Sequence, residues 1–121
     1  VNAGLHFLKM IEANKSFKVA VNRFAAACEE ATAENGYTIN DVNLIIPHQA
    51  NLRILQGMAK KLAVPMDKIY TTIEKYGNIS SATVPIALDE AARSGKLNKD
   101  DLVILSAFGG GFTWGSSLIR W

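Results

Sequence analysis

A histidine directly after a buried run is the first pattern in this sequence that could support catalysis. Leu44 to Ile46 is an apolar run of strand length, Pro47 ends it, and His48 follows. In open α/β sheets the ligand crevice lies outside the carboxyl ends of the strands, so a histidine there points toward a site. Asn78 and the glycine triplet 109–111 occupy similar junctions. A triple glycine leaves backbone N–H groups unobstructed, as an oxyanion site requires.

Taken singly, each of these features has a simpler explanation. A lone histidine after a strand is more often structural than catalytic. Asn78 follows a glycine, which is typical of a turn residue or a helix cap. The glycines by themselves indicate a tight turn. Only a fold that brings the three junctions together would turn them into a site.

The hydrophobic pattern predicts an α/β fold with the order βαβαβαββ. A helix from Asn14 or Ser16, one of which would cap it, runs to about Asn35 and stops at Gly36. A second follows His48 and ends before Pro65, and a third spans 82–94 with Gly95 as its stop. Expected strands are 6–11, 42–46, 69–73, 102–107 and 113–121. Such alternation indicates a mostly parallel five-stranded sheet with helices on both faces. The last strand should be antiparallel, because its connection is too short for a parallel crossover.

Composition excludes several classes of protein. The 121 residues fit one domain, and a hydrophobic content of 49% with 20% charged residues is typical of a soluble globular chain. No apolar run approaches the length of about 18 residues expected of a membrane helix, and no signal-peptide pattern is present. A net charge of +2 does not indicate a nucleic-acid partner. A single cysteine favours a reducing, cytoplasmic compartment.

Other kinds of site are excluded by the residues present. The glycine-rich segment lacks the lysine of a phosphate-binding loop and does not follow dinucleotide spacing. Two histidines and one cysteine, far apart, make a poor metal set, so no metal is expected. Cys28 lies on the apolar stripe of the first helix, with Phe17, Val21 and Phe24, and is interpreted as a buried hydrophobe rather than a nucleophile.

Three motifs together are far more specific than any one of them. Pro47-His48-Gln49-Ala50-Asn51, Gly77-Asn78-x-Ser80-Ser81-Ala82 and Gly109-Gly110-Gly111-Phe112 closely resemble the carboxyl-terminal half of β-ketoacyl-acyl carrier protein synthase III, which has a thiolase-like fold. The resemblance runs from about residue 17 to residue 121. It departs from the family over residues 10–13, where Met-Ile-Glu-Ala replaces a Met-x-Gly segment that approaches coenzyme A.

The resemblance implies a decarboxylative Claisen condensation of an acyl-coenzyme A with malonyl-acyl carrier protein, the starting step of type II fatty acid synthesis. Acyl-coenzyme A is a substrate, and no cofactor is expected. Residues matching His48 and Asn78 donate hydrogen bonds to the malonyl thioester oxygen, and the N–H of Gly110 matches a donor of a second oxyanion hole. Asn51 and Phe17 match positions near the pantetheine arm. Lys18, Arg53, Lys60 and Lys61 match a basic docking surface for acidic acyl carrier protein.

The family's nucleophilic cysteine belongs to an amino-terminal half that these residues do not include. We therefore expect the chain alone to be inactive and that half to be a partner. The apolar helix 82–94 should expose a surface that drives homodimer formation. Two alternatives stay open: a related polyketide or quinolone-type starter synthase domain, and a non-catalytic module that binds carrier protein.

Overall fold

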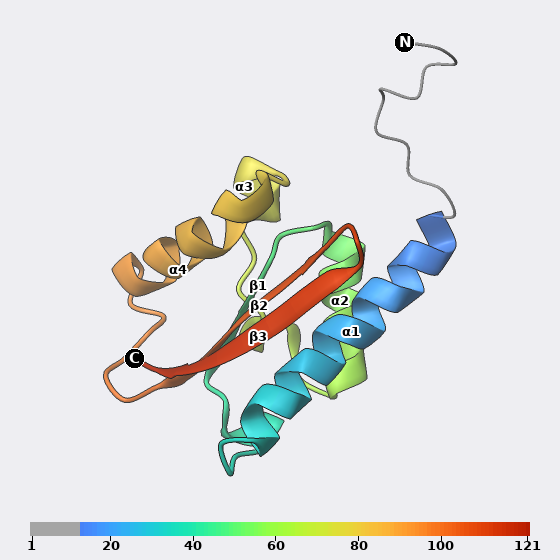
Figure 1. Ribbon diagram of the computed structural model, residues 1–121. Coiled ribbons are helices and arrows are strands. Elements are labelled where there is room, and N and C mark those ends of the chain that lie inside the picture. Colours follow the sequence, from blue (N-terminus) through green and yellow to red (C-terminus); the bar gives the residue numbers. More distant parts are fainter. Residues whose placement is uncertain (1–12) are drawn as a thin grey trace, which may run out of the picture.

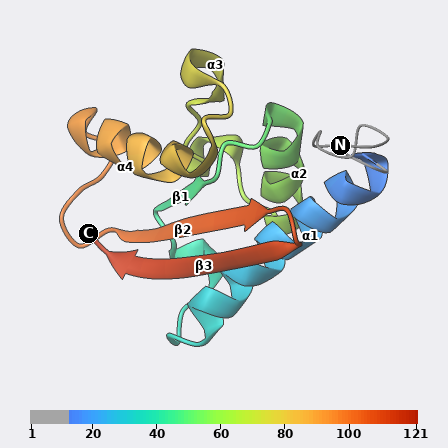
Figure 2. The same cartoon turned by 45° about the horizontal axis from the view of Figure 1, so that its top comes forward.

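The protein is built in layers around a small mixed sheet. The computed structural model describes residues 13–121. Helices α1 (Ala13–Ala33) and α2 (Leu52–Leu62) cover one face of the sheet, and α4 (Thr83–Arg93) covers the other (Figures 1 and 2). The prediction of helices on both faces is confirmed.

The described sheet has three strands in the order β1-β2-β3. Strand β1 (Leu44–Pro47) pairs in parallel with β2 (Leu102–Gly109), and β2 pairs antiparallel with β3 (Thr113–Arg120). The antiparallel last strand is therefore confirmed. Every residue of β1 is buried, as expected for a strand that is covered on both faces.

The two core clusters follow from the two-residue period of β1. Ile45 packs with Phe24 of α1 and Leu55 of α2, on the face that these helices cover. Its neighbours Leu44 and Ile46 belong to the cluster on the α4 side. Side chains on both faces of β1 are therefore packed in the core, and this packing fixes the position of the strand.

The predicted third strand, 69–73, is wrong. Only Ile69 pairs with the sheet, through an isolated parallel bridge to Ile45. Thr72 donates its backbone N–H to the side chain of Gln49, and the chain turns into the short helix α3 (Ile73–Tyr76). The backbone N–H of Thr72 is thus bonded to a side chain and not to a neighbouring strand. The β-branched composition of the segment gives no sign of this contact. The predicted strand 6–11 lies outside the described residues.

Some helix details also differ from expectation. Asn14 and Ser16 lie inside α1, and neither caps it. The predicted glycine stops are confirmed, because Gly36 and Gly95 have φ of +76° and +75° just after α1 and α4. No helix within residues 13–121 is long and apolar enough to cross a membrane.

Helix α4 buries only part of its apolar surface. Ala87 and Ala91 are buried against the sheet, and Leu88 is half-buried beside them. Thr83 is buried beside the ring of His48. Ile86 is 37% exposed. The sequence-based expectation of an apolar helix with a partly uncovered side therefore agrees with the structure at Ile86, but Leu88 belongs to the core.

Candidate functional site

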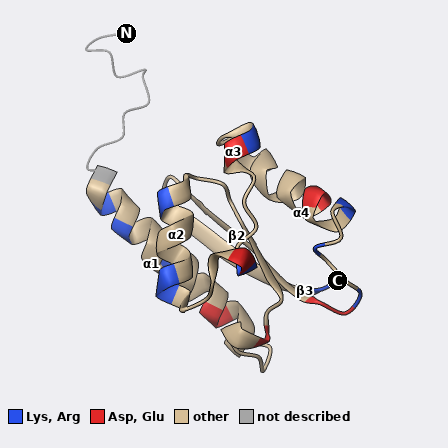
Figure 3. Cartoon of the chain, turned by 180° about the vertical axis from the view of Figure 1, so that it is seen from behind, with Lys and Arg blue, Asp and Glu red and all other residues tan. Residues whose placement is uncertain are grey.

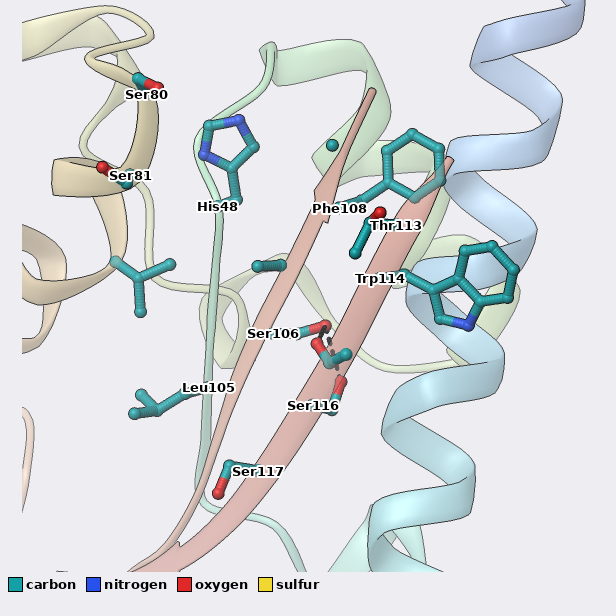
Figure 4. Close-up of a pocket in the computed structure, with 14 residues that line it drawn as sticks. His48, Ser80, Ser81, Leu105, Ser106, Phe108, Thr113, Trp114, Ser116 and Ser117 are labelled. Carbon is teal, nitrogen blue, oxygen red and sulfur yellow. Dashed lines mark hydrogen bonds between the residues drawn. The ribbon is translucent and has the colours of Figure 1, made fainter. Parts of the chain in front are cut away.

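An open cleft of about 780 Å³ lies between the start of α4 and the β2–β3 hairpin. His48, Ser80 and Ser81 lie on one side, and Phe108, Thr113 and Trp114 lie on the other (Figure 4). The cleft exists because α4 packs over β1 and part of β2 but leaves the end of the hairpin near Gly109 and Gly115 exposed.

His48 is held at the end of β1 by its backbone and by its ring. Its N–H donates to the carbonyl of Ser106 at 2.7 Å, which extends the β1–β2 pairing by one residue. Ring atom Nδ1 lies 2.6 Å from Oγ1 of Thr83. Burial lowers the pKa of the imidazole, and a hydrogen bond with the Ser80 backbone opposes this shift. The ring is therefore neutral at pH 7 and offers one N–H and one lone pair.

Gln49 fixes the loop that carries this histidine. Its side chain is fully buried and makes hydrogen bonds with three backbone groups. Nε2 donates to the carbonyls of Pro47 at 2.8 Å and Tyr70 at 3.1 Å, while Oε1 accepts from the N–H of Thr72 at 2.8 Å. Residues on both sides of His48 are thereby tied to the segment that leads to Asn78.

Asn78 lies beside the same loop. Its Nδ2 donates to the carbonyl of Ala50 at 3.3 Å, and its Oδ1 accepts from the N–H of Ser80 at 3.0 Å. An amide nitrogen carries two hydrogens, so one remains for a ligand. The structure thus brings the His48 and Asn78 loops together. The role of the two side chains toward a substrate stays a prediction.

The segment before Asn78 is positioned by Glu90 of α4. Its carboxylate accepts from Lys75 at 2.8 Å, Tyr76 at 3.1 Å and Tyr70 at 3.2 Å. The hydrogen bond from Lys75 lowers the pKa of Glu90 most, and the tyrosines add to the effect. This cluster docks α3 against α4, and Gly77 then turns the chain with φ of +66°.

Gly110 lies in the tight turn between β2 and β3. The turn carries Gly109 and Thr113 to the cleft wall, whereas Gly110 itself is exposed and is not part of that wall. Its place in the hairpin agrees with the predicted turn. Its use as an oxyanion donor stays a prediction.

The predicted pantetheine residues have structural partners within the chain. The side chain of Asn51 caps α2 by accepting from the N–H of Ile54 at 2.9 Å. Phe17 is half-buried on α1, with the guanidinium of Arg53 5.7 Å from its ring centroid. The two residues lie near the amino-terminal end of α2, away from the cleft wall.

Exposed basic side chains gather on the two helices of the α1–α2 layer. Lys18 is on α1, and Arg53, Lys60 and Lys61 are on α2; all are exposed. Figure 3 shows basic segments on these neighbouring helices, with acidic segments toward the other end of α1. The four residues, which we call the basic face, therefore share one layer of the molecule.

Cys28 is a buried core residue, as the sequence indicates. It has no exposure, and its Sγ lies 3.8 Å from Oγ of Ser116. Burial raises the pKa of the thiol, outweighing its hydrogen bonds with Ser106 and Ser116. A protonated, inaccessible thiol is a poor nucleophile.

Sequence reasoning missed the residues that position the site. Gln49, Thr83 and Glu90 were not singled out, although they hold His48 and the Asn78 segment. Gln49 is adjacent to the histidine, which offered a weak signal. Thr83 and Glu90 look like ordinary helix residues, and only tertiary contacts reveal them.

Comparisons with known proteins decide the family. The family model described as 3-oxoacyl-[acyl-carrier-protein (ACP)] synthase III C terminal matches residues 32–121. The chain belongs to this family. It is 49% identical over 112 residues to a β-ketoacyl-[acyl-carrier-protein] synthase III of Xanthomonas euvesicatoria, which covers 93% of this chain and 34% of that relative. The chain thus spans about a third of the length of the curated relatives it matches, and it corresponds to their carboxyl-terminal part.

Solved structures support the same assignment. The 3-oxoacyl-[acyl-carrier-protein] synthase III of Aquifex aeolicus matches with a TM-score of 0.89 and 44% identity, covering 93% of this chain and 36% of that one. A priming β-ketosynthase from the R1128 polyketide biosynthetic pathway matches with a TM-score of 0.84 and 32% identity, covering 92% and 34%. The fold is therefore that of the thiolase-like synthase III enzymes.

Gln49→Leu should destabilise this synthase III domain. The substitution leaves the buried N–H of Thr72 and two carbonyls without their partner, and one buried unsatisfied group costs about 1–3 kcal/mol. The free energy of unfolding, measured with urea, should fall by at least that amount. Gln56→Leu, at an exposed position of α2, is the matched control and should change stability little. Equal free energies of unfolding for the two variants would contradict a stabilising role of the Gln49 hydrogen bonds.

Proposed function

We propose that this chain is the carboxyl-terminal catalytic part of a 3-oxoacyl-[acyl-carrier-protein] synthase III. The reaction would join an acyl group from acyl-coenzyme A to malonyl-acyl carrier protein. The malonyl carboxylate leaves as carbon dioxide, and its electron pair passes to the α-carbon and the thioester oxygen. The carbanion then attacks the acyl thioester of a cysteine in the amino-terminal part, and the thiolate departs.

The observation that carries this proposal is the pairing of the two loops. Asn78 donates to the carbonyl of Ala50, which places the amide beside the turn that begins at His48. Both side chains are neutral and fixed by hydrogen bonds. Neutral, preorganised donors stabilise the enolate-like oxygen that forms as carbon dioxide leaves, without adding a competing base. Family membership supports the choice of reaction.

The matched R1128 priming β-ketosynthase supports a second candidate. That protein acts in a polyketide pathway by its name, so this chain could belong to a starter synthase with the same chemistry and another acyl group. The third candidate is a non-catalytic carrier-protein-binding module, which would need the basic face but not the loops. Decarboxylation assays separate this module from the two enzymes.

Removing either proposed donor should suppress malonyl decarboxylation. The assay uses a hybrid in which this chain replaces the matching carboxyl-terminal segment of the Xanthomonas euvesicatoria synthase. His48→Ala or Asn78→Ala should slow carbon dioxide release about 10²–10³-fold, as for other oxyanion donors, and should affect acylation of the cysteine less. Asn40→Ala, an exposed asparagine outside the cleft, is the control.

Two results would contradict this assignment. One is that both variants decarboxylate the malonyl group normally but fail to acylate the cysteine. This result would assign His48 and Asn78 to the acylation step. The other is product formation by the 121-residue chain alone. We expect none, because its one cysteine, Cys28, is buried with a raised thiol pKa.

The basic face is proposed to dock acidic acyl carrier protein. Reversing Arg53, Lys60 and Lys61 to glutamate should weaken carrier-protein binding and flatten its salt dependence, because exposed charges are screened within about 10 Å at 0.1 M salt. Titration at two ionic strengths measures both effects. Arg93, Lys96 and Lys99, all exposed near the end of α4, provide a control with the same charge change. Equal losses for both triple variants would mean that only net charge matters.

We also propose that the isolated chain forms a homodimer through the uncovered side of α4. Ile86→Lys should shift sedimentation at micromolar concentration from dimer toward monomer, because it places a charge on the exposed apolar surface. Met66→Lys is the control, since Met66 is 36% exposed outside α4. A monomeric chain that binds no hydrophobic dye would exclude this interface, and a dimer that persists in Ile86→Lys would place the contact elsewhere.

A further inference from the structure

The hydroxyl of Thr83 is the only side-chain group of the described residues that is hydrogen-bonded to the ring of His48. Thr83 is the first residue of α4 and is 1% exposed. Its Oγ1 lies 2.6 Å from Nδ1 of His48, 3.0 Å from the carbonyl oxygen of Ser80 and 3.2 Å from the backbone N of Gln49. Ser80 itself has a positive φ of +56°, which belongs to the turn that presents its carbonyl to Thr83.

These contacts compete for one hydrogen. A hydroxyl has one hydrogen and two lone pairs, and the N–H of Gln49 occupies a lone pair. The hydrogen can point to Nδ1 of His48 or to the carbonyl of Ser80. In the first arrangement the neutral ring carries its own hydrogen on Nε2. In the second arrangement Nδ1 must carry the hydrogen and donate to Thr83, which leaves a lone pair on Nε2.

We propose that Thr83 is a positioning residue: its hydroxyl donates to Nδ1 and holds the hydrogen of His48 on Nε2. The contact with Nδ1 is 0.4 Å shorter than the contact with Ser80 (2.6 against 3.0 Å). Figure 4 shows Nδ1 facing the loop of Ser80 and Ser81, with Nε2 pointing away from that loop. His48 lines the cleft, so this tautomer offers a donor to an oxygen atom bound there.

The inference deepens the proposed function, on which its use in catalysis rests. A neutral histidine can stabilise the malonyl thioester oxygen only from a nitrogen that carries hydrogen. The backbone carbonyl of Ser80 accepts but cannot donate, so it would stabilise the opposite tautomer. Thr83 is thus the group that makes His48 a donor without giving it a charge.

The test is a long-range ¹H–¹⁵N NMR correlation of the histidine rings in the 121-residue chain at neutral pH, which reports the tautomer directly. The chain has two histidines, and His6→Gln assigns the signals of His48. We expect the hydrogen on Nε2 in the unsubstituted chain and in Thr83→Ser. In Thr83→Val, which lacks the hydroxyl, it should move to Nδ1 and donate to the Ser80 carbonyl. Thr32→Val removes another buried hydroxyl, one bonded within α1, and should leave the tautomer unchanged.

Two spectroscopic results would overturn the proposal: hydrogen on Nδ1 in the unsubstituted chain, or on Nε2 in folded Thr83→Val. The first is decisive even if Thr83→Val fails to fold. In the hybrid synthase, Thr83→Val should slow decarboxylation about 10²-fold, and Thr83→Ser should restore most of the rate. If the unsubstituted hybrid releases no carbon dioxide while the tautomers follow the expected pattern, the proposed function fails and the positioning role of Thr83 stands.

Discussion

The burial of Gln49 is the constraint on which the rest of the site depends. A primary amide without solvent contact must satisfy its donors and acceptor inside the protein. Gln49 does so with the backbone of Pro47, Tyr70 and Thr72. The same bonds hold the end of β1 against the segment that runs to Asn78. Local bonding of one side chain therefore fixes the relative position of two loops that are far apart in sequence.

The surrounding fold gives these loops a rigid base and an open space. Strand β1 is packed on both faces, so the position of His48 at its end is well determined. Helix α4 begins at Thr83, beside the histidine ring, and leaves the β2–β3 hairpin partly uncovered. Residues of the hairpin, among them Phe108, Thr113 and Trp114, then form the far wall of the cleft. Rigid support of this kind holds polar side chains in a fixed geometry, as a preorganised site requires.

Much of this arrangement could be predicted from sequence, because it follows from hydrophobic periodicity and turn residues. The apolar runs before His48 and before Gly109 predict strands that the structure contains, and Gly36 and Gly95 predict the ends of two helices. The structure of segment 69–73 could not be predicted correctly. Its β-branched residues are typical of a strand, but the backbone N–H of Thr72 donates to the side chain of Gln49 and not to a neighbouring strand. The same limitation hid Thr83. Propensity and spacing describe a segment alone, whereas these residues act through partners more than twenty positions away.

The central claim is that His48 and Asn78 meet one substrate oxygen. A crystal structure of the hybrid synthase with a malonyl thioester analogue that cannot decarboxylate tests it most directly. The thioester oxygen should lie about 2.7–3.1 Å from both Nε2 of His48 and Nδ2 of Asn78. An oxygen bound instead at the backbone of Gly110, with both side chains out of reach, would contradict the account.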